Sequence, residues 1–222
     1  MVAKAHPKSQ VLLVDDGSGP VESALLQPLV RNLKKEYPKH FSFLALPKNQ
    51  GKGGAILAAW RSPSKGFDFL GFVDADGALD PSEVGRVAAQ LGQGSKKSAL
   101  FGSRVKMLGF SVKRRLVRHY LGRIFATWVG VCLEPGIYDS QCGLKFIPAN
   151  VFKRLSPQMR GRGFSWDIEL LSGLLSVGCP IREIPVNWKD VPGSKVNFLR
   201  DGIRLLWETW REGRRIKSAP RP

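Results

Sequence analysis

The sequence predicts a single α/β domain in which a mostly parallel, Rossmann-like sheet is flanked by helices. Short apolar runs, typical of buried strands, alternate with stretches of helical periodicity along the chain. Four of these runs end in small or charged residues, as strands do where a ligand binds beyond their carboxyl ends. The 222 residues suffice for one domain with a real core, and no internal repeat or clear boundary divides residues 1–222.

The first unit is the apolar run at residues 10–14, which predicts a buried strand. It ends at Asp15 and Asp16, followed by Gly-Ser-Gly-Pro and by a helix predicted at about 21–36. A strand that stops at carboxylates and glycines indicates a loop that faces a ligand. The alternative is a plain turn in which Asp16 or Ser18 caps the helix.

The second unit is a strand at 41–46 followed by the glycine-rich stretch Lys48–Ala55, which precedes a helix predicted at 55–60. Backbone amides and two lysines at the start of a helix could bind phosphate oxygens. The spacing is not that of a Walker loop, so this stretch alone indicates little about function.

The third unit is the aromatic and apolar strand at 67–73, followed directly by Asp74-Ala75-Asp76-Gly77. Two carboxylates at a strand end suit a hard cation such as Mg or Mn, shared with substrate phosphates. The alternative is that both are ordinary strand-end and turn residues. A helix predicted at about 81–92 follows, capped near Asp80 or Ser82.

The remaining elements predict more strands and helices of the same fold. A strand at 99–104 is the fourth run with a polar end, a polar loop turns into a strand by residue 147, and further elements are helices at 148–155 and from 164 and a strand at 181–188. Asp167 and Glu169 are two residues apart and do not share a helical face. One could therefore face a site while the other caps a helix or pairs with a cation.

Two stretches predict basic amphipathic helices with aromatic residues, at 110–133 and at about 196–215. In each, an apolar stripe is accompanied by basic residues: Lys113, Arg114, Arg115, Arg118 and Arg123 in the first, and Arg200, Arg204, Arg211, Arg214 and Arg215 in the second. This pattern is typical of helices that lie on a membrane surface. It is also typical of helices that pack their stripe on the core and expose a basic face.

The formal net charge of +17 indicates a polyanionic partner, such as an anionic membrane, a phosphate-rich substrate or nucleic acid. Carboxylates at the strand ends argue against nucleic acid, although a non-catalytic basic module remains an alternative. Three cysteines without metal-ligand spacing predict a reducing compartment. No signal peptide and no apolar run of about 20 residues is present, so we expect a cytoplasmic protein peripheral to the membrane.

Seven short blocks together resemble a known family. They are Val14–Ser18, Asn49–Gly53, Asp74–Gly77, Gly102–Arg104, Tyr138–Lys145, Trp166–Leu171, and Ile184–Trp188 with Ser194–Val196. In this order they resemble the family 2 glycosyltransferases with a GT-A fold, and most of all the dolichyl-phosphate and other polyprenyl-phosphate sugar transferases.

The resemblance implies inverting transfer of a sugar, glucose or mannose, from UDP-glucose or GDP-mannose to a polyprenyl phosphate at the cytoplasmic membrane face, with Mg or Mn. Residues 1–105 would bind the nucleotide and residues 106–222 the acceptor. The implied nucleotide-sugar residues are Asp15, Asp16, Gly51, Lys52 and Asp74. Asp74 and Asp76 would hold the metal. The implied catalytic residues are Arg104, Asp139, Lys145 and Asp167, with Gln141, Trp166 and Glu169 on the acceptor side.

The acceptor decides whether a general base is needed. A phosphate monoester is already anionic near neutral pH and needs no strong base, whereas a glycan or lipid hydroxyl needs one. Asp167 is the first candidate for that base and Asp139 the second.

The chain departs from the family at its start, because only ten residues precede Val11. Family members begin with a strand that ends in a Pro-x-Tyr-Asn-Glu type motif. That strand is internal to the GT-A sheet, so we expect its neighbours to have unpaired backbone groups and the base pocket to be reduced. Either the true start lies upstream, or the chain is a shortened and inactive form.

Overall fold

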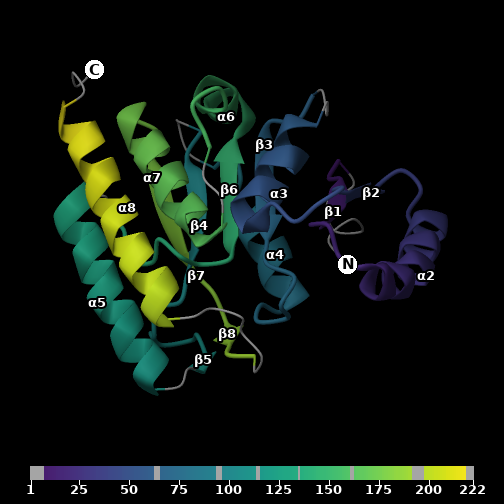
Figure 1. The fold of residues 1–222 in the computed structure, drawn as a ribbon, viewed down its shortest axis with the longest axis horizontal. Coiled ribbons are helices and arrows are strands. Elements are labelled where there is room, and N and C mark those ends of the chain that lie inside the picture. Colours follow the sequence, from purple (N-terminus) through teal and green to yellow (C-terminus); the bar gives the residue numbers. More distant parts are fainter. Residues whose placement is uncertain are drawn as a thin grey trace.

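A computed structural model describes residues 8–62, 66–93, 97–113, 116–134, 136–160, 163–191 and 198–218. The elements follow one another as drawn in Figure 1. They are β1 (Val11–Asp15), α2 (Pro20–Glu36), β2 (Phe41–Ala45), α3 (Gly51–Arg61), β3 (Phe69–Val73), α4 (Pro81–Ala88), β4 (Ala99–Ser103), β5 (Val112–Lys113), α5 (Leu116–Leu133), β6 (Leu144–Pro148), α6 (Ala149–Leu155), η1 (Gly163–Ser165), α7 (Trp166–Ser176), β7 (Ile181–Pro185), β8 (Trp188–Lys189) and α8 (Phe198–Ser218). The α/β class is confirmed.

The centre of the molecule is a four-stranded sheet in the order β3-β6-β4-β7. Strands β4 and β7 are parallel, and β6 runs antiparallel to both β3 and β4. Because β3 and β4 are each antiparallel to β6, their carboxyl ends lie at the same end of the sheet as the start of β6. The candidate site lies at this end of the sheet.

Helices cover both faces of this sheet, and side chains of successive strand residues alternate between the two covers. Phe101 joins the larger core with Trp60 of α3, Phe152 of α6 and the apolar residues of α7. Leu100, its neighbour in β4, joins a smaller core with Val87 of α4. All five residues of β4 are buried, as expected for an interior strand.

Strands β1 and β2 form a parallel sheet of their own, at one end of the molecule with α2 (Figure 1). Within the described residues, β1 is paired only with β2, and β3 only with β6. This agrees with the expectation of open strand edges. Strands β3 and β4 of residues 1–105 and strands β6 and β7 of residues 106–222 share the central sheet, whereas β1 and β2 lie outside it. At the outer edge of β3, the Trp60 indole donates a hydrogen bond to the Gly71 carbonyl at 3.2 Å.

Several boundaries differ from the prediction, and each has a local cause. Helix α3 begins at Gly51 rather than at 55, because the glycines join the helix and Gly53 and Gly54 are buried there. Helix α5 begins at Leu116 rather than at 110, because residues 112–113 pair with β8. The strand predicted at 181–188 breaks after Pro185, which has no N–H to continue the ladder.

The two amphipathic helices, α5 and α8, pack against each other and form one side of the molecule (Figure 1). No helix among the described residues has the length and apolar character needed to cross a bilayer. Of the basic residues predicted to accompany the two stripes, Arg114, Arg115, Arg118 and Arg200 lie outside the described side chains. Val196 and the Ser194–Val196 block also lie outside the described residues.

Candidate active site

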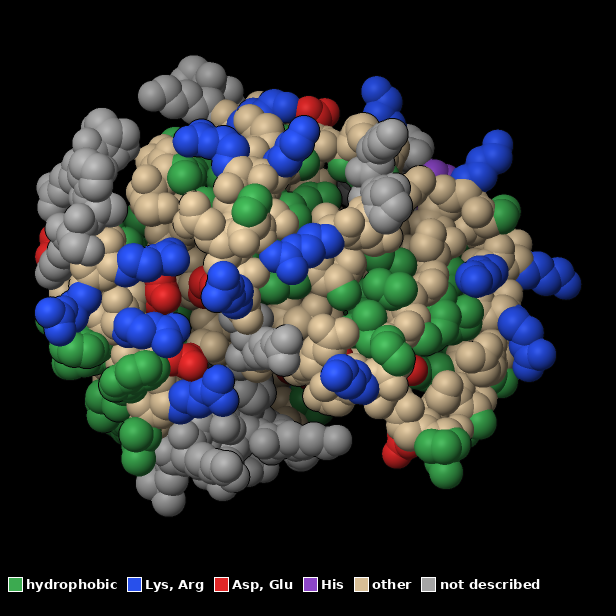
Figure 2. Space-filling view, turned by 45° about the horizontal axis from the view of Figure 1, so that its top comes forward, with side chains coloured by type: hydrophobic (Ala, Val, Ile, Leu, Met, Phe, Trp, Pro, Cys, Tyr) green, Lys and Arg blue, Asp and Glu red, His purple; other side chains and the backbone are tan. Residues whose placement is uncertain are grey.

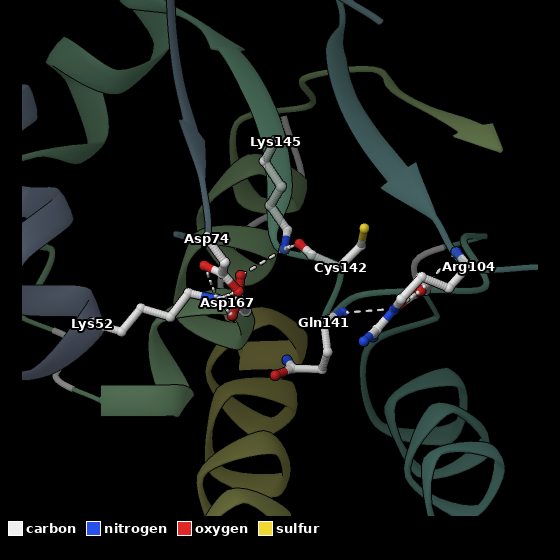
Figure 3. A network of polar contacts seen from close by, with 8 residues as sticks. Lys52, Asp74, Arg104, Gln141, Cys142, Lys145 and Asp167 are labelled. Atoms are coloured by element: carbon white, nitrogen blue, oxygen red, sulfur yellow. Dashed lines mark hydrogen bonds and ion pairs between the residues drawn. The ribbon is translucent and has the colours of Figure 1, made fainter. Parts of the chain in front are cut away.

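Four polar side chains from distant parts of the chain meet at the end of the central sheet where β3 and β4 terminate and β6 begins (Figure 3). Lys52, in the first turn of α3, donates hydrogen bonds to the carboxylates of Asp74 at 3.1 Å and Asp167 at 3.2 Å. Lys145, at the start of β6, donates to the other oxygen of Asp167 at 2.6 Å and to the Cys142 carbonyl at 2.7 Å. The result is a chain of alternating charges, which we call the Lys52–Asp167 network.

The centre of this network is buried, unlike an ion pair on the surface. The Asp167 and Lys145 side chains are 1% and 0% exposed, whereas those of Lys52 and Asp74 are 19% and 33% exposed. Burial alone would raise the pKa of Asp167, but the charges of Lys145 and Lys52 outweigh it and hold that pKa below its usual value. Burial likewise would lower the pKa of Lys52, but Asp167 and Asp74 raise it. Asp167 and Lys52 are therefore charged near neutral pH.

A second ion pair lies nearby, between Arg104 after β4 and Asp139. The Arg104 guanidinium donates through Nε at 2.7 Å and Nη2 at 2.8 Å to the two oxygens of the Asp139 carboxylate. This bidentate geometry is the strongest form of such a pair. Although burial would raise the pKa of Asp139, the Arg104 charge and its hydrogen bonds lower it well below its usual range.

Glu183 of β7 binds the backbone of the loop that carries Asp139. The Glu183 carboxylate accepts hydrogen bonds from the backbone N–H groups of Tyr138 at 2.6 Å and Asp139 at 2.7 Å. Burial raises the pKa of Glu183. Sequence reasoning missed this residue. Its one signal was a carboxylate in the middle of a strand that ends on the side of the sheet where the site lies.

The Asp15–Asp16 loop docks on the glycine-rich loop before α3. The Asp16 carboxylate accepts a hydrogen bond from the Gln50 N–H at 2.7 Å, and the Asp15 carboxylate accepts from the Ser18 N–H at 3.0 Å. Gly17 has a φ of +67°, and a Cβ there would lie 2.4 Å from the carbonyl carbon of Lys48. The N-cap position of helix α2 is Gly19, and no side chain caps the helix there. The alternative in which Asp16 or Ser18 caps the helix is therefore wrong.

Asp74 and Asp76 could supply only some of the ligands that a divalent cation needs. Asp76 is exposed, and one of its oxygens accepts a hydrogen bond from the Ala78 N–H at 3.0 Å. Within the described residues, no group of three or more His, Cys, Asp or Glu side chains could hold a metal. Mg²⁺ is commonly bound by one or two carboxylates with substrate phosphates and water, and that mode fits these two residues.

The other predicted site residues are distributed unevenly. The Gln141 Nε2 is buried and has no hydrogen-bond partner among the described residues, and its side chain lies between the Lys52–Asp167 network and Arg104 (Figure 3). Trp166 is fully buried in the larger core against Trp60, so it does not line an acceptor surface. Glu169 accepts a hydrogen bond from the Arg160 N–H at 2.8 Å, and it is Asp167 that faces the site.

The last block of the resemblance has a structural role. Asn187 donates to Glu83 of α4 through its side chain at 3.0 Å and accepts from the Ser111 N–H at 2.7 Å. The Arg104 guanidinium lies over the Trp188 ring, 5.5 Å from its centroid. All three cysteines are buried, and burial raises the pKa of the Cys142 thiol to about 11.

The fold thus brings strand-end carboxylates, basic side chains and a glycine-rich loop together at one site of an α/β domain. Residues 2–154 match Glycosyl transferase family 2, and the chain belongs to that family.

Its relatives include dolichyl-phosphate β-glucosyltransferases. The human enzyme is 31% identical over 209 residues, which are 89% of this chain and 62% of that protein. That of Dictyostelium discoideum is 28% identical over 200 residues, which are 88% of this chain and 60% of that protein. The chain thus spans about three fifths of the length of these relatives.

A solved structure shares the fold. The mannosyltransferase from Pyrobaculum calidifontis, in complex with GDP-Man and Mn²⁺, superposes with a TM-score of 0.60 at 17% identity. The match covers 96% of this chain and 56% of that one. The GT-A fold implied by the sequence blocks is therefore confirmed.

Proposed function

We propose that this chain transfers glucose, with inversion, from a nucleotide sugar to dolichyl phosphate or a similar polyprenyl phosphate. The relatives at 28–31% identity that are named for this reaction support the proposal. So does the site, where partly exposed cations border strand-end carboxylates. In this proposal residues 1–105 bind the donor and residues 106–222 the acceptor.

The observation that carries the choice of acceptor is the state of Asp167 and Asp139. Each carboxylate is bound by one or more cationic side chains and has a lowered pKa. A carboxylate in that state is a poor proton acceptor. A phosphate acceptor is anionic already and needs no base, so these ion pairs favour it over a glycan or lipid hydroxyl.

The roles of the cations differ with their exposure. Lys52 and Arg104, each about one fifth exposed, can meet phosphate oxygens of the donor or acceptor. The Lys145 ammonium is fully buried, so it positions Asp167 and the Cys142 carbonyl rather than contacting substrate. Gln141, unlike Lys145, is partly exposed as a residue, and its Nε2 has no hydrogen-bond partner among the described residues, so we assign it to the acceptor side.

A divalent ion completes this assignment. Lys52, Lys145 and Arg104 are already paired with carboxylates, so they neutralise little of an incoming diphosphate. Asp76, with Asp74, would hold Mg²⁺ or Mn²⁺ there. When bound, the ion would stabilise the negative charge that grows on the leaving diphosphate. Asp15, Asp16 and Gly51 would border the nucleoside.

The donor site is tested by calorimetric titration of the full chain with UDP-glucose and with GDP-mannose, each with and without Mn²⁺. We expect metal-dependent binding of one donor, and Asp76→Asn should weaken it by at least about tenfold, since one of two metal-binding carboxylates is lost. Asp68→Asn is the matched control, because Asp68 lies at the opposite end of β3 with its partner Lys97. Equal loss in both variants, or binding that ignores the metal, would count against the assignment.

The acceptor is tested by offering dolichyl phosphate and dolichol, which differ only in the phosphate, with the donor that binds. We expect transfer to dolichyl phosphate alone. Transfer to dolichol would show that one of the paired carboxylates acts as a base after all. Because the acceptor is a membrane lipid, the proposed location is the cytoplasmic surface of a membrane, with the domain peripheral to it.

A further inference from the structure

Helix α8 is turned with its most apolar stripe away from the protein. Ile203, Leu206, Trp207 and Trp210 follow helical spacing on one face, and their exposed fractions are 70%, 37%, 54% and 43%. The opposite face, buried against the domain, carries Glu208, Thr209 and Glu212. An ordinary surface helix has the reverse arrangement, with apolar residues inside and charged residues outside. Core packing therefore does not account for this stripe.

Helix α5 continues the same exposed surface. Tyr120, Ile124 and Val131 are 64%, 65% and 62% exposed and lie on one helical face. The Trp128 indole donates a hydrogen bond to the Leu206 carbonyl at 3.0 Å, which ties the two helices together. A hollow of about 420 Å³ lies between the stripes; it is lined by Ile124, Thr127, Trp128, Val131 and Leu206.

These stripes therefore form one continuous region, which we call the α5–α8 surface. It consists of Tyr120, Leu121, Ile124, Val131, Ile203, Leu206, Trp207 and Trp210. Figure 2 shows hydrophobic side chains beside a group of lysines and arginines on the side of the molecule that these helices form.

Arginines lie on the solvent side of α8 and stack on its tryptophans. The Arg211 and Arg214 guanidinium groups lie over the rings of Trp207 and Trp210, at 5.0 and 4.9 Å from their centroids. Glu208 and Glu212 of α8 are buried toward the domain, where Glu212 accepts a hydrogen bond from the Ser172 hydroxyl of α7 at 3.1 Å. They also pair with arginines of the same helix, Glu208 with Arg204 at 3.0 Å, and Glu212 with Arg215 at 3.1 Å and Arg211 at 3.7 Å. The solvent-facing side thus combines apolar and aromatic groups with positive charge, as interfacial helices do.

We propose that the α5–α8 surface seats this domain on an anionic lipid bilayer, with Trp207 and Trp210 in the headgroup layer and the stacked arginines against lipid phosphates. The occupant is a lipid surface rather than a second copy, because a second copy would bring the same positive charge to the contact. Apolar insertion and attraction to anionic lipids act together at such a surface.

This surface also lies close to the candidate site. Helix α8 packs against η1 and α7, and Asp167 is the second residue of α7. A domain seated in this way would hold its acceptor-binding half near the headgroups that carry a lipid phosphate. The inference deepens the proposed function, yet it is tested by vesicle binding without donor or acceptor, so either can fail alone.

The experiment is co-flotation of the full chain with vesicles of phosphatidylcholine, with and without about one third phosphatidylserine. We expect binding to the anionic vesicles only. Trp207→Ala with Trp210→Ala should weaken it by at least about tenfold, because two interfacial anchors are lost. Val21→Ala with Leu25→Ala is the matched control: both residues are over 70% exposed, on α2 at the other end of the molecule.

A second variant separates charge from apolar contact. Arg211→Gln with Arg214→Gln keeps both tryptophans and should reduce binding to anionic vesicles by about tenfold or more at low salt. Thermal unfolding of each variant checks that the fold is kept. Unchanged binding by either folded variant, or equal binding to neutral vesicles, would overturn the proposal. So would a wild-type dimer that the tryptophan variant dissociates.

Discussion

At the scale of single residues, Asp167 illustrates how the structure changes the meaning of a candidate base. Its carboxylate lies between Lys52 and Lys145 and is almost fully buried. Asp167→Asn would leave the buried Lys145 ammonium without its counter-charge, which is costly whatever the acceptor. Loss of activity in that variant therefore cannot distinguish a phosphate from a hydroxyl acceptor, and the comparison of dolichyl phosphate with dolichol is the sharper test.

Lys145 gives a direct prediction at this scale. Lys145→Met keeps an unbranched side chain between Phe72 and Phe101 but removes the nearer of the two cationic partners of Asp167. We expect the free energy of unfolding to fall by about 3 kcal/mol, as for other broken buried pairs. Urea denaturation measures it.

The control for that change is Lys97→Met, which breaks the ion pair with Asp68. Both of those side chains are more than half exposed, so solvent screens the pair and we expect a change below about 0.5 kcal/mol. Similar losses for the two variants would mean that the Lys52–Asp167 network contributes no more than a surface contact.

At the scale of elements, α5 and α8 are held together by close backbone approach. A Cβ on Gly213 of α8 would lie 2.5 Å from the Cys132 carbonyl oxygen of α5, and backbone atoms there cannot give way easily. This contact sets the distance between the helices, and so helps to define the α5–α8 surface.

Gly213→Ala tests that contact, and we expect it to lower the free energy of unfolding by about 2 kcal/mol through overpacking. Gly202→Ala in the same helix is the control, because a Cβ there meets no atom within 4 Å among the described residues. It should stabilise the protein by about 0.5–1 kcal/mol, as alanine is the better helix former. Thermal or urea unfolding gives both values, and a neutral Gly213→Ala would contradict the close contact.

At the scale of the whole molecule, the two sheets differ in how much core supports them. In residues 8–50, only Asp15 and Val30 are buried, whereas most of β4, β6 and α7 is. The donor side of the proposed site therefore rests on a thinly packed unit, and the buried ion pairs belong to the well-packed unit.

Hydrogen exchange tests this difference. We expect amides of β1, β2 and α2 to open with a free energy at least about 2 kcal/mol lower than those of β4, β6 and α7, since few apolar contacts support the first group. Peptide-level mass spectrometry resolves the two sets. Equal protection would show that the molecule opens as one unit. A donor that binds Asp15 and Asp16 should slow exchange in the first set selectively.

Much of this protein follows from its sequence, because the relevant patterns are local. The apolar runs predicted each main strand, and Asp80 caps α4 as predicted, accepting a hydrogen bond from the Ser82 N–H at 2.8 Å. The strand-end blocks indicated the family and the sheet edge where Asp74, Arg104 and Lys145 meet. Short-range periodicity and turn chemistry determine such features, and they are visible along the chain.

Features that depend on distant partners in the sequence could be seen only in the folded protein. The two lysines that bind Asp167, Lys52 and Lys145, lie 115 and 22 positions before it in the sequence, and no local sequence pattern specifies them as its partners. The stripe on α8 has the same periodicity whether it faces the core or the solvent. The surrounding packing, which buries Glu208, Thr209 and Glu212 instead, determines that it faces outward.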